Sequence, residues 1–429
     1  MNPHRLHLGT LGLSLGSNPK DIEQVNQTLD MWDGMIRSSF IYKGKAYLVE
    51  TACDPTLDMI ATHVQSKGNI ALDIRFAYPT GGHCDDACDW NKDHLHSTML
   101  VSQDKNSAVL KRTIDETVYF VMLRWQGTAK LKQKGKNFYQ LQSKSADVKL
   151  TCEYAEQVSS VSKTFAEVAD AAKAYWNHYW QKGAMVDFGQ CKDSRAKEME
   201  RRVVLSQYLL AIQDAGETPP QETLPAVTTV NPPFELCQWL CALKIAQEWR
   251  GRLGKARDAH WDDIIAKISP LASKDSLYLA AETEPDTYTK ERMFSDHPAV
   301  MGAIGLFPYN SRMIDFAKMK KTEQWIWKNW KWNTSWGWDY PMMAMGAARM
   351  GEPKNAVGAP LMKQQKNTYL VSGHNYQDGR LRLYLPGNGA LLMAVAMMCA
   401  GWDGSIHPNP GFPQDGNWNV KWEDLKPLP

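Results

Sequence analysis

Residues 1 to about 150 alternate between apolar and polar positions over short stretches, as β-strands do when one face is packed and the other is wet. These stretches are rich in β-branched and aromatic residues, and turn sequences such as KGK, SKGN and QKGKN separate them. Regular short strands between such turns predict an antiparallel β-sandwich. The stretches are FIYKGKAYLVETAC, NIALDIRFAYP, AVLKRTI, TVYFVMLRW, FYQLQS and DVKLTCEY.

From Thr164 onward, the apolar positions recur with the period of a helix. The first helical stretch is TFAEVADAAKAYWNHYWQKG, and Gly183 is expected to end it. Its predicted packed face contains Phe165, Val168, Ala172, Tyr175, Trp176 and Tyr179. No strand pattern competes after residue 200, where the helical stretches are AKEMERRVVLSQYLLAIQDAG, PFELCQWLCALKIAQEWRGRLG, WDDIIAKISPLA, HPAVMGAIGLF, YPMMAMGAARMG, KNAVGAPLMKQQ and GALLMAVAMMCAG.

The change of period predicts three parts of the chain. Residues 1–155 are expected to form the β-sandwich, 156–193 a linker helix, and 194–429 an all-α domain of stacked helix pairs. The connections within the α domain are rich in Trp, Pro, Gly and Asp. Loops of this kind on a rigid scaffold are typical of functional sites.

Composition excludes several classes of partner. The 429 residues include 49 basic and 47 acidic side chains, so no basic surface for nucleic acid is expected. The longest apolar run, Ala390 to Ala400, is too short to span a membrane and predicts a buried helix. The N-terminal MNPHRLHLGTLGL lacks the pattern of a secretory signal and is similar to the interior of a longer protein.

Cofactor and metal motifs are not found. Cys84 and Cys88 have a spacing that a metal site uses, but no second pair follows, so two loop thiols or one local disulfide is the simpler interpretation. The sequence also has no G-x-S-x-G elbow, no P-loop, no G-x-G-x-x-G after a strand and no H-E-x-x-H. We therefore expect no metal and no organic cofactor.

Six tryptophans lie between Trp325 and Trp338, in QWIWKNWKWNTSWGWDYP. Indoles beside polar groups suit a surface that stacks on sugar rings. Trp336 and Trp338 flank Gly337 and precede Asp339, so we expect both indoles to be partly exposed in a pocket with this carboxylate. The alternative is that Asp339 only caps a helix. Most of Trp325, Trp327, Trp330 and Trp332 should be buried or packed at the domain surface.

Further polar candidates lie in the loops. Glu217 and Glu222 of ETPPQET and Glu235 of NPPFEL are acidic residues near prolines, where paired carboxyl groups could cleave a glycosidic bond. With 47 acidic residues in the chain, their number alone is weak evidence. Asp296 and His297 are an acid/base pair or a helix cap.

The loops SGHNYQ and LYLPGNG bring polar side chains and glycines into one region of the sequence. His374, Asn375 and Asn388 would suit the hydroxyl groups of a saccharide. The alternative is that Gly387 and Gly389 only permit a tight turn before the last helix.

The order of sandwich, linker helix and helical hairpins resembles the six-hairpin glycosidases, which are (α/α)6-toroid enzymes. LPGNGALLMAVAMMCAG, EMERRVVLSQYLLAIQDAGETPPQET and AYWNHYWQKGAMVDF are similar to segments of glycoside hydrolase families 65 and 95, and TVNPPFELCQWLCALKIAQEW to an uncharacterised bacterial branch. The resemblance implies an inverting glycoside hydrolase that acts on an oligo- or polysaccharide. It also implies a periplasmic or extracellular full-length parent.

Two features depart from that family. A toroid has twelve helices, but this chain supplies eight to ten, and one QET (221–223) stands for two loops, which predicts an internal deletion. If this QET corresponds to the second loop, the resemblance implies that Glu222 is the general acid; if it corresponds to the first loop, the glutamate would be structural. Pro386 and Gly387 stand where an acidic residue is expected, so Asp339 is the substitute base. Saccharide contacts are expected from Trp336, Trp338, His374, Asn375, Asn388 and Glu235. The alternatives are a glycoside phosphorylase and an inactive saccharide-binding or structural remnant.

Overall fold

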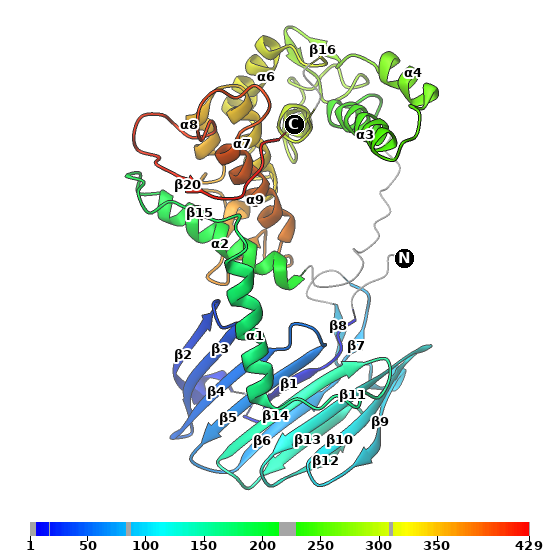
Figure 1. The fold of residues 1–429 in the computed structure, drawn as a ribbon, viewed down its shortest axis with the longest axis vertical. Coiled ribbons are helices and arrows are strands. Elements are labelled where there is room, and N and C mark those ends of the chain that lie inside the picture. Colours follow the sequence, from blue (N-terminus) through cyan, green and yellow to red (C-terminus); the bar gives the residue numbers. More distant parts are fainter. Residues whose placement is uncertain (1–5, 17, 83–86, 214–228, 309–311, 429) are drawn as a thin grey trace. The chain divides into compact units, whose positions relative to one another are not determined.

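The computed structural model of the chain describes residues 6–16, 18–82, 87–213, 229–308 and 312–428. The chain divides into two compact units, Pro3–Lys182 and Gly183–Pro429 (Figure 1). We call them the β-sandwich unit and the helical unit and describe each by itself. Together they confirm the predicted fold class, an antiparallel β-sandwich followed by a helical region.

The β-sandwich unit consists of a large and a small antiparallel sheet. In spatial order, the large sheet contains β2 (Ile22–Asp30), β3 (Met35–Tyr42), β4 (Lys45–Cys53), β5 (Met59–Ser66), β14 (Asp147–Ala155), β11 (Thr117–Gln126), β10 (Ser107–Ile114) and β9 (His96–Gln103). The small sheet contains β1 (Thr10–Leu13), β6 (Ile70–Arg75), β13 (Phe138–Ser143) and β12 (Ala129–Gly135). A separate pair is formed by β7 (Tyr78–Pro79) and β8 (Cys88–Asp89).

Alternate side chains of the two sheets form one apolar core. In β11, Val121, Leu123 and Trp125 are buried in it, and in β13 Tyr139 and Leu141 are. The residues between them point to the other face of each sheet, because successive side chains of a strand alternate. The alternation in the sequence therefore predicted these strands well.

A buried arginine, Arg112, lies in the same core. It is fully buried, and it donates to Thr98 Oγ1 at 2.7 Å and to the Tyr119 hydroxyl at 3.3 Å, while its Nη2 lies 2.8 Å from His96 Nδ1. The Tyr119 hydroxyl in turn donates to the carbonyl of Leu8 at 2.7 Å. These bonds offset the cost of removing the guanidinium from water.

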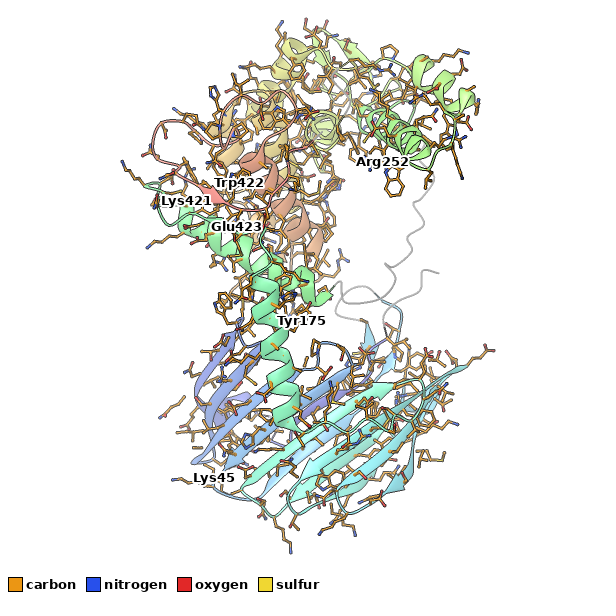
Figure 2. The ribbon with its side chains drawn as sticks, viewed as in Figure 1. Lys45, Tyr175, Arg252, Lys421, Trp422 and Glu423 are labelled. Atoms are coloured by element: carbon orange, nitrogen blue, oxygen red, sulfur yellow. The ribbon has the colours of Figure 1, made fainter. Side chains whose placement is uncertain are left out.

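Helix α1 (Phe165–Trp180) packs on the large sheet, against β3, β4, β5 and β14 (Figure 1). Thr164 and Glu167 form a capping box at its start. The buried face is Phe165, Val168, Ala172, Trp176 and Trp180, which corrects the predicted face at two positions. Tyr175 is exposed (Figure 2), and Trp180 takes the place of Tyr179 because its indole N–H donates to the carbonyl of Met31 at 2.8 Å.

The described residues of the helical unit form eight α-helices. Helix α7 packs against α5, α8 and α9, and α9 also packs against α2. Residues Asp339 to Ala348 of α7 are all buried, so this helix forms the centre of the core. The helices are α2 (Ala196–Gln213), α3 (Pro233–Arg252), α4 (Ala259–Lys267), α5 (Gly302–Gly305), α6 (Phe316–Asn329), α7 (Asp339–Arg349), α8 (Pro353–Gly358) and α9 (Leu385–Ala400).

Short elements connect these helices and correct the expectation that no strand follows residue 200. The strands after residue 200 are β16 (Ser273–Lys274), β17 (Leu277–Tyr278), β18 (Thr368–Tyr369), β19 (Asn375–Tyr376) and β20 (Lys421–Trp422), and β20 pairs with β15 (Val186–Asp187), which precedes α2. Each has two residues and pairs with one other short strand, so it leaves no alternating pattern in the sequence. The 3-10 helices of this unit are η3 (Glu291–Phe294), η4 (Ala299–Met301) and η5 (Gln365–Asn367), whereas η1 (Pro19–Asp21) and η2 (Asp93–Leu95) belong to the β-sandwich unit.

Helix α6 was not predicted. It buries only Met319, Thr322, Glu323 and Ile326, and two of these four residues are polar. A helix that packs through such a narrow and partly polar stripe gives little apolar period. This segment was therefore interpreted through the tryptophans at its end, and no helix was predicted.

The structure contains no membrane-spanning candidate among the described helices, since none combines enough length with enough apolar character. Within the same residues, no cluster of three or more His, Cys, Asp or Glu side chains could hold a metal ion. Cys88 carries a free thiol, and Cys84 lies outside the described residues.

Candidate active site at the start of helix α7

Asp339 is the first residue of α7, and its side chain is fully buried. Both carboxylate oxygens lie 3.0 Å from Nδ1 of His297. One of them also accepts the backbone N–H of Trp336 at 2.7 Å. The residue that precedes the helix is Trp338, which makes no side-chain cap. Asp339 therefore does not cap α7, and its carboxylate oxygens instead contact His297 and the backbone of Trp336.

The pair of Asp339 and His297 holds a proton tightly. Burial lowers the pKa of His297, but the hydrogen bond and the charge of Asp339 outweigh it, so this pKa is raised. Burial raises the pKa of Asp339, and the His297 hydrogen bond compensates only in part. We infer an imidazolium–carboxylate pair that persists above the pH at which a free imidazole loses its charge.

Asp296 extends this pair toward solvent. Its side chain is exposed, and its Oδ1 accepts the indole N–H of Trp336 at 2.7 Å and lies 3.6 Å from Nε2 of His297. The backbone of Asp296 has a φ of +64°, which is uncommon for a residue with a side chain. Its N–H donates to Thr334 Oγ1 at 2.8 Å and so holds this conformation. The three groups form a line from a buried carboxylate through an imidazole to an exposed carboxylate.

Two half-buried indoles border the line. The ring of Trp336 lies 5.9 Å from that of His297 and 5.6 Å from that of Tyr384, and Nζ of Lys366 lies 4.5 Å from its centre. The ring of Trp338 lies 5.1 Å from that of His297. Both indoles are thus close to the pair of Asp339 and His297, and Trp336 also contacts Tyr384.

The other four tryptophans of the cluster belong to the packed part of the unit. Trp330 is buried, and its indole N–H donates to the carbonyl of Asp296 at 3.2 Å. The other three are partly buried against the apolar core: Trp325, Trp327 and Trp332.

Buried amides hold the loop beside the indoles. The side-chain oxygen of Asn388 accepts the backbone N–H of Asn375 at 3.0 Å, and its amide donates to Ser206 Oγ at 2.8 Å. Gln377 Oε1 accepts the N–H of Gly337 at 3.1 Å, and its amide donates to Asn375 Oδ1 at 2.6 Å. Asn375 and Asn388 are fully buried, so they support the loop from inside the protein.

The remaining candidates lie apart from this cluster or outside the described residues. His374 has its Nδ1 3.1 Å from Ser372 Oγ, and burial lowers its pKa. Glu235 lies in the first turn of α3 and, among the described residues, makes no hydrogen bond or ion pair with the cluster. Glu217 and Glu222 lie outside the described residues, so the pairing of Glu222 and Asp339 as acid and base stays a prediction.

Sequence reasoning did not find three contributors to the cluster: Lys366, Gln377 and Tyr384. Tyr384 lies two residues before Pro386, within the quoted LYLPGNG, so the glycine turn was the available signal. Lys366 and Gln377 follow no motif, because their roles depend on the way in which two loops meet. Asp296 and His297 were noted in the sequence, but not their contact with Asp339.

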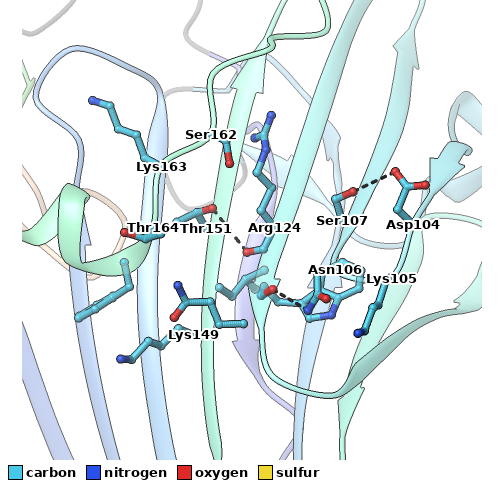
Figure 3. A pocket seen from close by; sticks show the side chains of 14 residues that line it. Asp104, Lys105, Asn106, Ser107, Arg124, Lys149, Thr151, Ser162, Lys163 and Thr164 are labelled. Carbon is cyan, nitrogen blue, oxygen red and sulfur yellow. Dashed lines mark hydrogen bonds between the residues drawn. The ribbon is translucent and has the colours of Figure 1, made fainter.

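A separate hollow of about 430 Å³ lies in the β-sandwich unit (Figure 3). Lys105, Arg124, Lys149 and Lys163 line it. Arg124 lies 3.3 Å from Glu153, and Lys163 lies 2.5 Å from Asp54, so two of these four charges are already balanced by carboxylates. We assign no ligand to this hollow.

No protein-family model and no curated protein matches the sequence. Among solved structures, the fold is similar to that of a protein from the human microbiome provisionally named a kojibiose phosphorylase. That similarity has a TM-score of 0.61 at 9% identity and covers 94% of this chain and 80% of the other. A family GH92 α-mannosidase from Bacteroides thetaiotaomicron matches at a TM-score of 0.23 and 9% identity, over 80% of this chain and 48% of the other. The first similarity shows a shared fold, whereas the second is too low to do so.

Proposed function

We propose that this chain is a carbohydrate-active enzyme that cleaves a glycosidic bond at the start of α7. The observation that carries the proposal is the exposed carboxylate of Asp296, held beside His297 and two half-buried indoles. Indole faces bind the apolar faces of sugar rings, and a carboxylate supplies acid/base chemistry to the bond between them. The fold shared with the provisionally named kojibiose phosphorylase supports the same class of activity.

In this proposal, Asp296 is the base and Asp339 is a positioning residue. Asp339 is fully buried and accepts bonds from His297 and Trp336, so it orients the imidazole. Asp296 uses Oδ1 for the Trp336 indole, and among the described residues its Oδ2 makes no hydrogen bond. That oxygen is able to accept a proton from an attacking water, as inverting hydrolysis requires. The general acid remains Glu222, as the family resemblance implies.

Phosphorolysis is the alternative form of the same reaction, with phosphate in place of water as the nucleophile. His297, with its raised pKa, and Lys366, above the Trp336 ring, bring positive charge to the cluster. Positive charge at this position would favour an anionic nucleophile. Hydrolysis releases a free sugar, whereas phosphorolysis releases a sugar phosphate and requires inorganic phosphate.

A second function, saccharide binding without catalysis, is favoured by one observation. The described residues hold eight α-helices in place of the twelve of a complete toroid. A chain of this second kind would bind an oligosaccharide and release no product.

The test is a panel of disaccharides, oligosaccharides and aryl glycosides, assayed with and without inorganic phosphate. We expect turnover, and we expect Asp296→Asn to lower kcat about a hundredfold or more while binding is retained. Asp403→Asn changes an exposed aspartate that has no contact with the cluster and should leave kcat unchanged. Binding with no product from any substrate would establish the second function, and neither binding nor turnover would refute both.

A further inference from the structure

Helix α3 is apolar on two opposite faces. One face is buried in the unit and contains Leu236, Leu240 and Leu243. The opposite face leaves 62% of Trp239 and 60% of Trp249 exposed. Exposed indoles that lie along one stripe of a helix are typical of an interface. This face is therefore a candidate interface.

The exposed face, which we call the α3 stripe, has large residues toward both ends and small residues in the middle. Its members follow one another at three or four positions, so they lie along one side of the helix. They are Trp239, Ala242, Ala246, Trp249 and Leu253. Small residues in the middle let a second helix approach closely, while the indoles at the ends cover it. The pattern therefore fits another helix better than a flat surface.

The rest of the helical unit leaves this face free among the described residues. Helix α3 contacts α4 and α5, and it lies with α4 at one edge of the unit (Figure 1). Trp239 and Trp249 make no ring contact with another described aromatic residue. Leu253, just beyond the helix end, is 66% exposed and continues the stripe.

We propose that the α3 stripe binds the same stripe of a second copy of this chain, with the two helices antiparallel. Trp239 and Trp249 are equally distant from position 244, and so are Ala242 and Ala246. An antiparallel pair centred at this position therefore places each indole on an indole of the other copy and each alanine on an alanine. A two-fold interface requires this self-complementarity.

Charge selects the antiparallel arrangement. Glu235 lies in the first turn of α3 and Arg252 in its last turn (Figure 2 labels Arg252). Antiparallel helices place Glu235 of one copy beside Arg252 of the other at both ends of the contact. Parallel helices in register would instead place like charges together, which disfavours that arrangement.

The contact is small. At these exposed fractions, each indole offers roughly 100–150 Å² for burial, so the whole stripe falls below the ~800 Å² per partner of a standard interface. We therefore expect a dimer that dissociates on dilution rather than a permanent one.

Sedimentation equilibrium of the full chain, from nanomolar to hundreds of micromolar, tests the proposal. We expect a monomer–dimer equilibrium whose Kd rises about tenfold or more in Trp249→Ala and in Trp239→Ala. The matched control is Trp32→Ala, because Trp32 is 55% exposed and belongs to the β-sandwich unit. Circular dichroism of each variant verifies that it is folded.

A charge exchange tests the orientation. Glu235→Arg and Arg252→Glu should each weaken the dimer, and the double variant should restore it, because the pair is then reversed but still opposite in sign. A double variant as weak as the single ones would overturn the antiparallel arrangement. A monomer at every concentration would overturn the dimer, as would a dimer insensitive to both tryptophans. If the protein is a monomer and acrylamide does not quench the fluorescence of these indoles, another part of the same chain covers the α3 stripe.

Discussion

At the scale of single residues, Asp339 and Asp296 differ in exposure, and this difference separates their proposed roles. Asp339 is fully buried against His297, so its charge acts on the imidazole rather than on solvent. Replacing it by Asn removes the charge that raises the pKa of His297, while burial continues to lower that pKa. The charge of Asp296 still raises this pKa, but less than Asp339 does, so we expect Asp339→Asn to lower the pKa of His297, measured by NMR titration of the ring.

The sign of the pH effect follows from the raised pKa. The pair stabilises the fold fully below the ordinary pKa of histidine, and this stabilisation is lost as the pH rises through the raised value. Asp403→Asn removes a carboxylate elsewhere in the unit and should leave the His297 titration unchanged. A His297 pKa that stays raised in Asp339→Asn would show that another group holds the proton.

Trp336 is the indole with the most polar contacts in the cluster, and its ring is half-buried. A stacked ring contributes about 1 kcal/mol beyond area burial, so Trp336→Ala should weaken saccharide binding about tenfold. Calorimetric titration measures the affinity, and thermal unfolding should show an intact fold. Trp330→Ala is the contrasting variant, because Trp330 is buried and its loss should lower stability instead. If Trp336→Ala unfolds the protein, the indole belongs to the core, and the proposal that it stacks on a sugar ring is wrong.

Glu323 of α6 is fully buried, and neither carboxyl oxygen has a hydrogen-bond partner among the described residues. Burial, with a smaller effect of Glu352, raises its pKa from 4.5 to about 7. The folded chain therefore binds this proton more tightly than the unfolded chain, and stability falls as the pH rises between these two values.

We expect Glu323→Gln to remove that part of the pH dependence. From about pH 4 to about pH 8, the variant should lose about 3 kcal/mol less of its unfolding free energy than the natural chain does. Urea unfolding at both pH values measures the difference. Equal pH dependence in the two proteins would show that Glu323 is ionised in the fold.

At the scale of elements, the contact between two loops holds the candidate site. A Cβ on Gly337 would lie 1.8 Å from Asn375 Oδ1 and 2.7 Å from Gln377 Nε2. Gly337→Ala should therefore push the two loops apart and cost about 1–3 kcal/mol of unfolding free energy, measured in urea. Gly379→Ala is the control, because a Cβ there has nothing within 4 Å. An unfolding free energy that is unchanged in Gly337→Ala would mean that the two loops move apart at no cost.

The elements of the chain could be predicted where the apolar positions had a clear pattern. They could not be predicted where packing between loops determines the structure. The strands of the sandwich follow the alternation of the sequence, and α2, α3, α7 and α9 lie in stretches that were expected to be helical. Helix α6 and the two-residue strands do not, because few of their side chains are apolar and buried. At the site, the tryptophans and Asp339 were visible as a motif. The contact of Asp339 with His297 was not, because 42 positions separate the two residues in the sequence.

At the scale of the whole molecule, each unit has an apolar core of its own. We therefore expect residues 6–182 to fold alone, with a cooperative urea transition and the circular dichroism of a β protein. A chain that stops at residue 163 is the control. It lacks α1, which covers Met35, Ala52 and Met59 of the large sheet, and should be less stable. If residues 6–182 do not unfold cooperatively, the β-sandwich unit depends on the rest of the chain.

The sequence predicted the order of the two units better than the arrangement of the helices. A change from an alternating to a helical period marks the transition between units and requires no knowledge of partners. Which helices become neighbours depends on side chains far apart in the chain, such as Asn388 of α9 and Ser206 of α2. The incomplete toroid, the internal deletion and the bounds of the three predicted parts therefore stay predictions.

The small sheet sets the order in which the sandwich is able to form. Leu11 of β1 pairs with Ile74 of β6, and Ile74 pairs in turn with Tyr139 of β13. During synthesis, β1 therefore has no partner until β6 has been made, and β6 lacks its second partner until β13 emerges. Until then, the apolar side chains of β6 have no complete sheet to support them. Because pairing between distant segments is slow, we expect this unit to refold slowly and to depend on chaperones while it is unfinished.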